Sequence, residues 1–160
     1  MERLKILVVD DESRMRKLVR DFLVREDYEV LEAGDGEEAL DVFYKEKNIA
    51  LIILDVMMPK LNGWEVCKEI RETSKVPIIM LTAKSDESDE LTGFELGVDE
   101  YITKPFSPKI LVARVSAILR RSIWTWRSRL PWLKMRDLFV LSYCSFQPIW
   151  LPIPVALLVI

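Results

Sequence analysis

Up to Arg121, short apolar segments alternate five times with longer amphipathic segments. The apolar segments have the length of strands and lie at Lys5–Val9, Glu29–Ala33, Leu51–Leu54, Pro77–Leu81 and Tyr101–Thr103. Three of them are almost purely apolar, as expected for strands that are buried on both faces of a parallel sheet. The alternation therefore predicts an α/β domain with a doubly wound, five-stranded parallel sheet.

The amphipathic segments predict five helices that cover this sheet. They lie at Ser13–Arg25, Gly36–Lys47, Trp64–Glu72, Asp86–Leu96 and Pro108–Arg120. Apolar residues recur in them at helical spacing, which is typical of helices packed on a core. Gly97 stands where a left-handed residue ends a helix, and Ser107 followed by Pro108 is a helix start signal.

Polar residues of different chemistry follow the apolar segments: Asp10 and Asp11, Asp55, Thr82 and Lys104. The carboxyl ends of parallel strands meet at one edge of a sheet, and ligands bind there at the point where the strand order reverses. For the strand order 2-1-3-4-5, this point lies between the first and third strands, where the three aspartates are expected. A single Asp could be a helix cap or a loop charge. The combination of all five side chains favours a binding site.

The expected chemistry of this site is phosphorylation of a carboxylate with the help of a divalent cation. Three carboxylates within ~4–5 Å repel each other by about 1–4 kcal/mol per pair, and Mg²⁺ would relieve this repulsion because it prefers oxygen ligands. We interpret Asp10 and Asp11 as metal-side carboxylates and Asp55 as both ligand and nucleophile. The ammonium of Lys104 would neutralise the transferred oxygens, and Thr82 would donate a hydrogen bond to one of them.

Composition excludes several other functions. The chain contains no histidine, so it cannot be a phosphohistidine donor or use a His-dependent triad. Its net charge of −3 gives no indication of nucleic-acid binding. Cys67 and Cys144 are too few for a disulfide framework, and the N-terminus lacks an apolar signal region, so we expect a cytoplasmic protein.

The residues after Arg121 follow a different pattern. Residues 122–160 contain four of the five Trp and none of the five Gly, and residues 138–160 carry no charge. This uncharged run is long enough to span a bilayer, and basic residues precede it. Pro148, Pro152 and Pro154 disfavour a helix there. We expect one domain at 1–121 and a hydrophobic tail at 122–160, which is either a membrane anchor or a truncated or aberrant terminus unrelated to the fold.

Four stretches resemble the receiver domain of bacterial two-component response regulators. They are VVDDE at 8–12, LIILDVMMPKLNGWE at 51–65, PIIMLTAK at 77–84 and GVDEYITKPFSPKILVARVSAILRR at 97–121. The resemblance covers about residues 3–121. It implies a flavodoxin-like receiver fold and a phosphoacceptor that receives its phosphoryl group from a sensor histidine kinase. Such a domain is not a turnover enzyme.

The resemblance also implies a role for each matched position. Asp55 matches the phosphoacceptor, Asp10 and Asp11 match the metal-binding acids, and Met57 matches the residue whose backbone carbonyl completes the metal site. Thr82 and Lys104 match the phosphate-sensing pair. Tyr101 matches the aromatic residue that turns inward on activation, and the Lys104-Pro105 bond matches a cis peptide.

Within the family, the resemblance is strongest to regulators whose receiver precedes a winged-helix DNA-binding domain. These dimerise through the fourth helix, fifth strand and fifth helix, which implies an interface containing Asp99, Glu100, Ile110, Arg114 and Arg121. Glu90 and Ile110 depart from the usual charges and remove one salt bridge, although such surface pairs are usually worth less than ~1 kcal/mol. No winged-helix pattern follows, so we do not expect this chain itself to bind DNA.

Two other functions stay open. A Mg²⁺-dependent phosphohydrolase can also use an Asp nucleophile on a parallel sheet, but such enzymes carry a second acid two positions later. Met57 occupies that position here. A membrane-tethered interaction module would depend on residues 122–160 instead of the acidic site.

Overall fold

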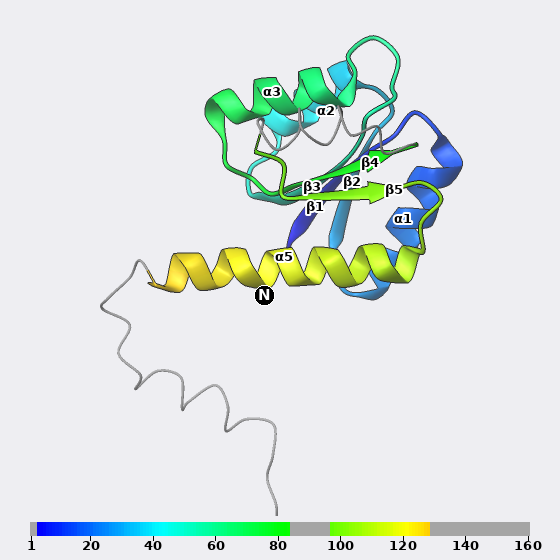
Figure 1. Cartoon of the computed structure of the whole chain (residues 1–160). Helices are drawn as coiled ribbons and strands as arrows, with labels where there is room; N and C mark the ends of the chain where they lie inside the picture. Colours follow the sequence, from blue (N-terminus) through cyan, green and yellow to red (C-terminus); the bar gives the residue numbers. More distant parts are fainter. Residues whose placement is uncertain (1–2, 84–96, 129–160) are drawn as a thin grey trace, which may run out of the picture. The chain divides into compact units, whose positions relative to one another are not determined.

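The computed structural model describes residues 3–83 and 97–128 (Figure 1). Five strands form one sheet, all paired in parallel: β1 (Lys5–Val9), β2 (Glu29–Ala33), β3 (Ile49–Asp55), β4 (Ile78–Thr82) and β5 (Glu100–Thr103). Their order across the sheet is β2-β1-β3-β4-β5. The predicted fold class and strand order are confirmed.

The described helices are α1 (Ser13–Arg25), α2 (Gly36–Lys45), α3 (Gly63–Thr73) and α5 (Pro108–Ser128). The predicted helix at Asp86–Leu96 lies outside the described residues. α2 ends before its predicted end because Glu46 is extended and Asn48 has a positive φ of 66°. α5 continues past Arg120, and no Gly or Pro interrupts the residues that follow as far as Leu130.

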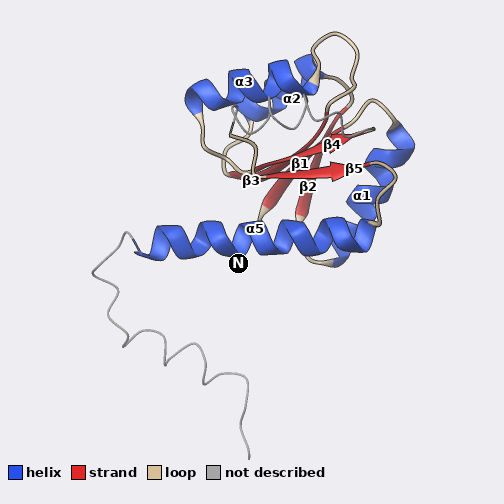
Figure 2. Cartoon of the chain, in the orientation of Figure 1, coloured by secondary structure: helices blue, strands red, loops and turns tan. Residues whose placement is uncertain are grey.

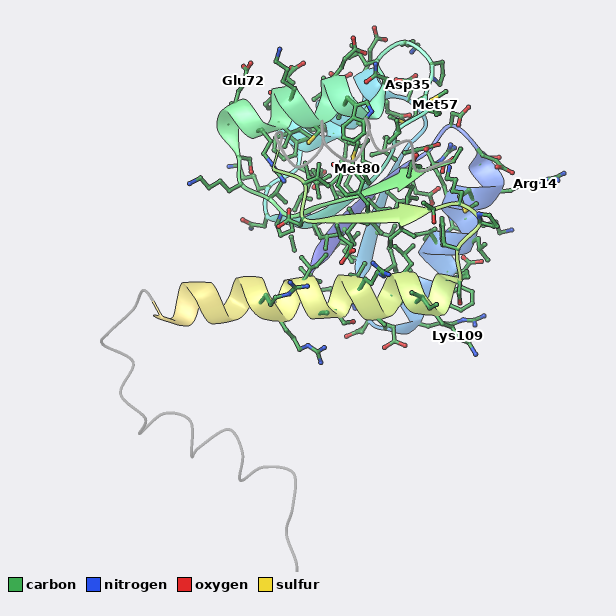
Figure 3. The ribbon with its side chains drawn as sticks, in the orientation of Figure 1. Arg14, Asp35, Met57, Glu72, Met80 and Lys109 are labelled. Atoms are coloured by element: carbon green, nitrogen blue, oxygen red, sulfur yellow. The ribbon has the colours of Figure 1, made fainter. Side chains whose placement is uncertain are left out.

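Helices cover both faces of the sheet (Figure 2). Odd-numbered residues of β1, such as Leu7, pack in one buried cluster with residues of α2 and α3. Even-numbered residues, such as Ile6, pack in the other cluster with residues of α1 and α5. Met80 of β4, labelled in Figure 3, belongs to the first cluster, as does Cys67, whose burial raises the pKa of its thiol. Both faces are therefore apolar, as the near-continuous apolar strands predicted.

The strand register brings the carboxyl ends of the strands to one edge. Val9 pairs with Leu54, and Thr82 pairs with Thr103. The residues that end or follow β1, β3, β4 and β5 must therefore lie close together. Gly97 has the predicted left-handed conformation, with a φ of 73°.

None of the described helices is both long and apolar enough to cross a membrane. The candidate membrane anchor at residues 138–160 lies outside the described residues.

Candidate functional site

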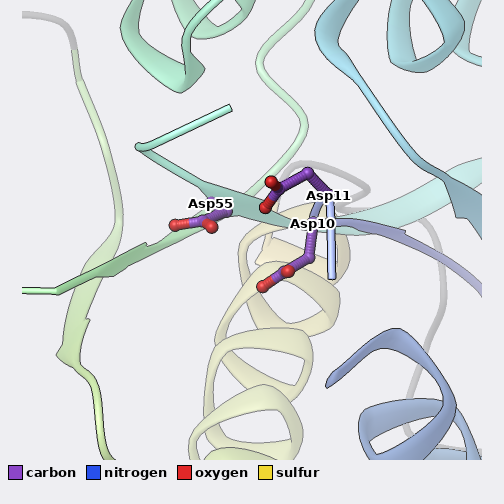
Figure 4. Close-up of side chains that lie close together, drawn as sticks. All are labelled: Asp10, Asp11 and Asp55. Carbon is purple, nitrogen blue, oxygen red and sulfur yellow. The ribbon is translucent and has the colours of Figure 1, made fainter. Parts of the chain in front are cut away.

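Three carboxylates meet at the edge of the sheet where β1 and β3 end (Figure 4). Asp10 and Asp11 follow β1, and Asp55 is the last residue of β3. One oxygen from each lies within 4.8 Å of the others. Asp10 and Asp55 are 1% and 4% exposed, whereas Asp11 is exposed. The predicted acidic cluster is therefore present, with two of its members buried.

Lys104, which follows β5, joins two of these carboxylates. Its Nζ donates to Asp10 Oδ2 at 2.7 Å and to Asp55 Oδ2 at 2.8 Å. Its backbone N–H donates to the carbonyl of Thr82 at 2.6 Å. The peptide bond between Lys104 and Pro105 is cis, as the resemblance implied. One residue thus connects the ends of β1, β3 and β4.

Burial and charge act in opposite directions on these groups. Burial raises the pKa of Asp55, and the hydrogen bond and positive charge of Lys104 only partly oppose this effect. Burial lowers the pKa of Lys104, but its hydrogen bonds to Asp10 and Asp55 and their negative charges outweigh burial, so the net pKa is raised. The ammonium stays charged between two carboxylates, and its positive charge offsets part of their repulsion.

The loop after β3 is held tightly against Asp55. Asp55 Oδ1 accepts a hydrogen bond from the N–H of Met57 at 3.4 Å, and the N–H of Gly63 donates to the carbonyl of Val56 at 3.0 Å. A Cβ atom at Gly63 would lie 2.3 Å from the carbonyl oxygen of Asp55, so any residue other than glycine would force the backbone there to shift. α3 therefore begins directly against the backbone of the predicted nucleophile.

Two further predicted residues, Thr82 and Tyr101, lie on the neighbouring strands. Thr82 is the last residue of β4 and is 6% exposed. Tyr101 of β5 is partly buried, and its ring centroid lies 6.0 Å from that of Trp64 with an interplanar angle of 40°. Trp64 had been predicted only as a helix residue, and its contact with Tyr101 is a finding of the structure.

The donor atoms at this edge suit a hard divalent cation. The three carboxylates supply oxygen ligands, which Mg²⁺ prefers, and two of them are already desolvated. Asp10, Asp11 and Asp55 are the residues that could hold it. Met57 lies on the following loop with its side chain exposed (Figure 3), and the role of its carbonyl stays a prediction.

The residues predicted for a dimer interface lie on β5, on α5 and just before β5. Glu100 forms an ion pair with Arg114 at 2.5 Å. Asp99 Oδ2 accepts one hydrogen bond from Arg71 at 3.3 Å and another from the N–H of Ile78 at 3.0 Å. Ile110 is 54% exposed, and Arg121 Nε donates to the carbonyl of Ala117 at 3.5 Å. Both acidic side chains thus have basic partners within the chain, and the interface stays a prediction.

Sequence reasoning missed two basic residues that hold the loops around the site. Arg16 of α1 donates to the backbone carbonyls of Asp10 and Asp11 at 2.6 and 3.2 Å. Lys60, on the loop after β3, donates to Asp35 at 2.6 Å, and Asp35 caps α2. Their proximity in sequence to the predicted acids was the only available signal.

The chain belongs to the response regulator receiver domain family, whose model matches residues 6–116. The matched residues include Asp10, Asp11, Asp55, Thr82 and Lys104. The fold and the position of the site agree with this membership.

Among its relatives, the "Probable transcriptional regulator ycf27" of Porphyridium aerugineum is 55% identical over 121 residues, 76% of this chain and 50% of that protein. The "Transcriptional regulatory protein ResD" of Bacillus subtilis (strain 168) is 54% identical over 121 residues, with the same coverage. The chain thus spans about half the length of these relatives. The solved structure of response regulator DrrB, a Thermotoga maritima OmpR/PhoB homolog, is 40% identical with a TM-score of 0.68, covering 76% of this chain and 54% of that chain.

Proposed function

We propose that Asp55 accepts a phosphoryl group from a sensor histidine kinase in a Mg²⁺-dependent reaction. The observation that carries this proposal is the edge where three carboxylates lie within 4.8 Å of one another and Lys104 contacts two of them. Membership of the receiver family supports it. An isolated acidic cluster would be weak support, but here the carboxylates lie beside a partly buried ammonium and a buried hydroxyl residue.

The residues of the chain divide the chemistry between them. Asp10, Asp11 and Asp55, with the Met57 carbonyl, would hold Mg²⁺, which when bound neutralises charge on the phosphoryl oxygens. A carboxylate oxygen of Asp55 forms the new O–P bond as the N–P bond of the donor phosphohistidine breaks, and its electron pair leaves on the imidazole.

After transfer, two side chains contact the phosphoryl group. The ammonium of Lys104 can move its hydrogen bond from Asp55 Oδ2 to a phosphoryl oxygen while it keeps the bond to Asp10. The hydroxyl of Thr82 donates to a second oxygen. A shift of Thr82 and Tyr101 then changes the face formed by β5, α5 and the predicted fourth helix.

This face would control an output, which we propose is transcription in full-length relatives. Ile110 is an exposed apolar residue near the start of α5, and we propose that two copies of the chain associate through this face, with Asp99, Glu100, Arg114 and Arg121 around it. Treatment with beryllofluoride, a phosphoryl mimic, followed by measurement of size in solution tests this association.

The phosphoacceptor role is tested by labelling the full chain with acetyl phosphate and measuring intact mass. We expect one phosphoryl group per chain with Mg²⁺, little with EDTA, and none in Asp55→Asn. Asp41→Asn, the same substitution at an exposed position on α2, serves as the matched control and should label normally. Labelling of Asp55→Asn to the level of the parent chain would contradict the assignment, and sustained turnover of a phosphomonoester would favour a phosphohydrolase.

A further inference from the structure

Arg16 makes contacts that connect α1 to the backbone of the acidic site. One of its terminal nitrogens, Nη1, donates to the carbonyl of Asp10 at 2.6 Å and to the carbonyl of Asp11 at 3.2 Å. Both acceptors belong to the loop between β1 and α1. The guanidinium therefore binds the main chain of the two acids and leaves their carboxylates available to the site.

The guanidinium is itself anchored on its other side. Its Nε lies 3.6 Å from Glu32 Oε2 on β2, and the Arg16 side chain is only 19% exposed. Glu32 also pairs with Arg20, one turn further along α1, at 2.7 Å. Nε makes no hydrogen bond among the described residues, so the contact with Glu32 is an ion pair. Because a guanidinium is planar and rigid, this ion pair and the hydrogen bonds of Nη1 restrict its position relative to β2 and to the loop.

The position of this loop decides where the carboxylates point. Asp10 is restrained by Lys104 and by the N–H of Glu12, which donates to Asp10 Oδ1 at 2.8 Å. Asp11 is exposed, and within the described part of the chain its carbonyl is linked to α1 by the hydrogen bond from Arg16. Like charges favour an open loop in which Asp11 moves away from Asp10 and Asp55.

We propose that Arg16 is a positioning residue for the Mg²⁺ site, which holds the loop closed so that Asp11 meets Asp10 and Asp55. The inference rests on the proposed function, because it requires that these carboxylates bind Mg²⁺. Groups that orient metal ligands typically change metal affinity 10–100-fold when they are removed. Arg16 contacts the backbone of Asp10 and Asp11 and not their carboxylates, so we expect a change in Mg²⁺ affinity at the lower end of that range.

The test compares Arg16→Met with Arg20→Met in the full chain. Both variants remove one positive charge from α1 and one partner of Glu32, but Arg20 contacts neither Asp10 nor Asp11 in the described structure. Loss of positive charge alone would tighten Mg²⁺ binding in both variants. Loss of positioning weakens it in Arg16→Met only, so the two explanations predict opposite signs.

Isothermal titration with Mg²⁺ measures the dissociation constant directly. We expect Arg16→Met to raise it about tenfold, equivalent to ~1.4 kcal/mol, and Arg20→Met to leave it within about twofold of the parent chain. In labelling with acetyl phosphate, the half-saturating Mg²⁺ concentration should rise by the same factor, while the rate at saturating Mg²⁺ stays nearly unchanged. A role in stability alone would lower the unfolding midpoint without moving either Mg²⁺ value.

Equal Mg²⁺ affinity in the two variants would overturn the inference. If the parent chain binds no Mg²⁺, the proposed function itself fails, and the two failures are therefore distinct. Should Arg16→Met not fold by circular dichroism, Arg16→Lys replaces it. A single ammonium cannot reproduce the planar fork, so we expect about a threefold rise in the dissociation constant, and an unchanged value would likewise overturn the inference.

Discussion

Replacing Lys104 by Met should destabilise the domain strongly when no divalent cation is present. The ammonium lies 2.7 Å and 2.8 Å from oxygens of Asp10 and Asp55, whose side chains are 1% and 5% exposed. At an effective dielectric of 20, each contact is worth about 6 kcal/mol before the cost of desolvation. Removing one partner of a buried pair costs about 3–5 kcal/mol. Because the Lys104 side chain is one-fifth exposed, we expect the lower end, about 3 kcal/mol.

The same substitution should strengthen Mg²⁺ binding. Lys104 neutralises one of three negative charges and hydrogen-bonds oxygens that belong to the predicted metal site, so it competes with the ion. In Lys104→Met, the ion meets the full charge of the three carboxylates. At a Mg²⁺ concentration 100 times the dissociation constant, binding stabilises the folded state by ~2.7 kcal/mol. Added Mg²⁺ should therefore restore most of the lost stability, and should stabilise this variant more than the parent chain.

Urea unfolding of the full chain, followed by circular dichroism in EDTA and in Mg²⁺, measures both effects. Lys60→Met is the matched control, because Lys60 pairs with two carboxylates, of Asp35 and Glu37, but its side chain is 53% exposed. That control should lose less than ~1 kcal/mol, whether or not Mg²⁺ is present. A loss below ~1 kcal/mol for Lys104→Met in EDTA, or a weaker effect of Mg²⁺ on it than on the parent chain, would refute this reasoning.

Two further substitutions, Gly63→Ala and Asp35→Asn, test the loops around the site, and Gly34→Ala is the control for the first. Gly63→Ala would place a Cβ 2.3 Å from the carbonyl oxygen of the predicted phosphoacceptor. The free energy of unfolding should therefore fall by ~1–3 kcal/mol, and labelling by acetyl phosphate should become slower. Gly34→Ala, with its nearest contact at 3.4 Å, should change neither. The pKa of Asp35 is lowered from 3.8 by hydrogen bonds from the N–H of Glu38 and from Lys60. A depressed pKa stabilises the fold above the unfolded value and loses this effect as the pH falls through the folded value. In Asp35→Asn, the free energy of unfolding measured in urea should therefore fall less steeply than in the parent chain below about pH 3.8. The same pH dependence in both chains would contradict this.

Strands and helices could be told apart in the sequence because each apolar segment is short and because apolar residues recur at helical spacing in each amphipathic segment. Element ends were less predictable, since they depend on partners that are distant in sequence. β3 begins at Ile49 instead of the predicted Leu51 because Ile49 pairs with Lys5 of β1. α2 ends before Asn48, which has a positive φ. Asn48 lies in a polar stretch, where the sequence does not indicate which residue will adopt this conformation.

The acidic site was predictable for a similar reason. Strand order places the polar residues that end the strands together, so Asp10, Asp55 and Lys104 could be assigned before any distance was known. The sequence could not predict that one ammonium contacts both carboxylates. Nor could it predict which charges pair within the chain, as Glu100 does with Arg114, because complementary side chains can pair within one copy or between two.

Arg16 illustrates a further limit of sequence reasoning. A side chain that binds another side chain leaves a complementary pair in the sequence, and such a pair can be recognised by its charge and spacing. Arg16 instead binds two carbonyl oxygens, and every residue has a carbonyl. The sequence therefore does not indicate which carbonyls Arg16 binds, and they can be identified only from the path of the loop between β1 and α1. Residues that position a site through the backbone must be found from structure, even where the ligands themselves can be read from their order along the chain.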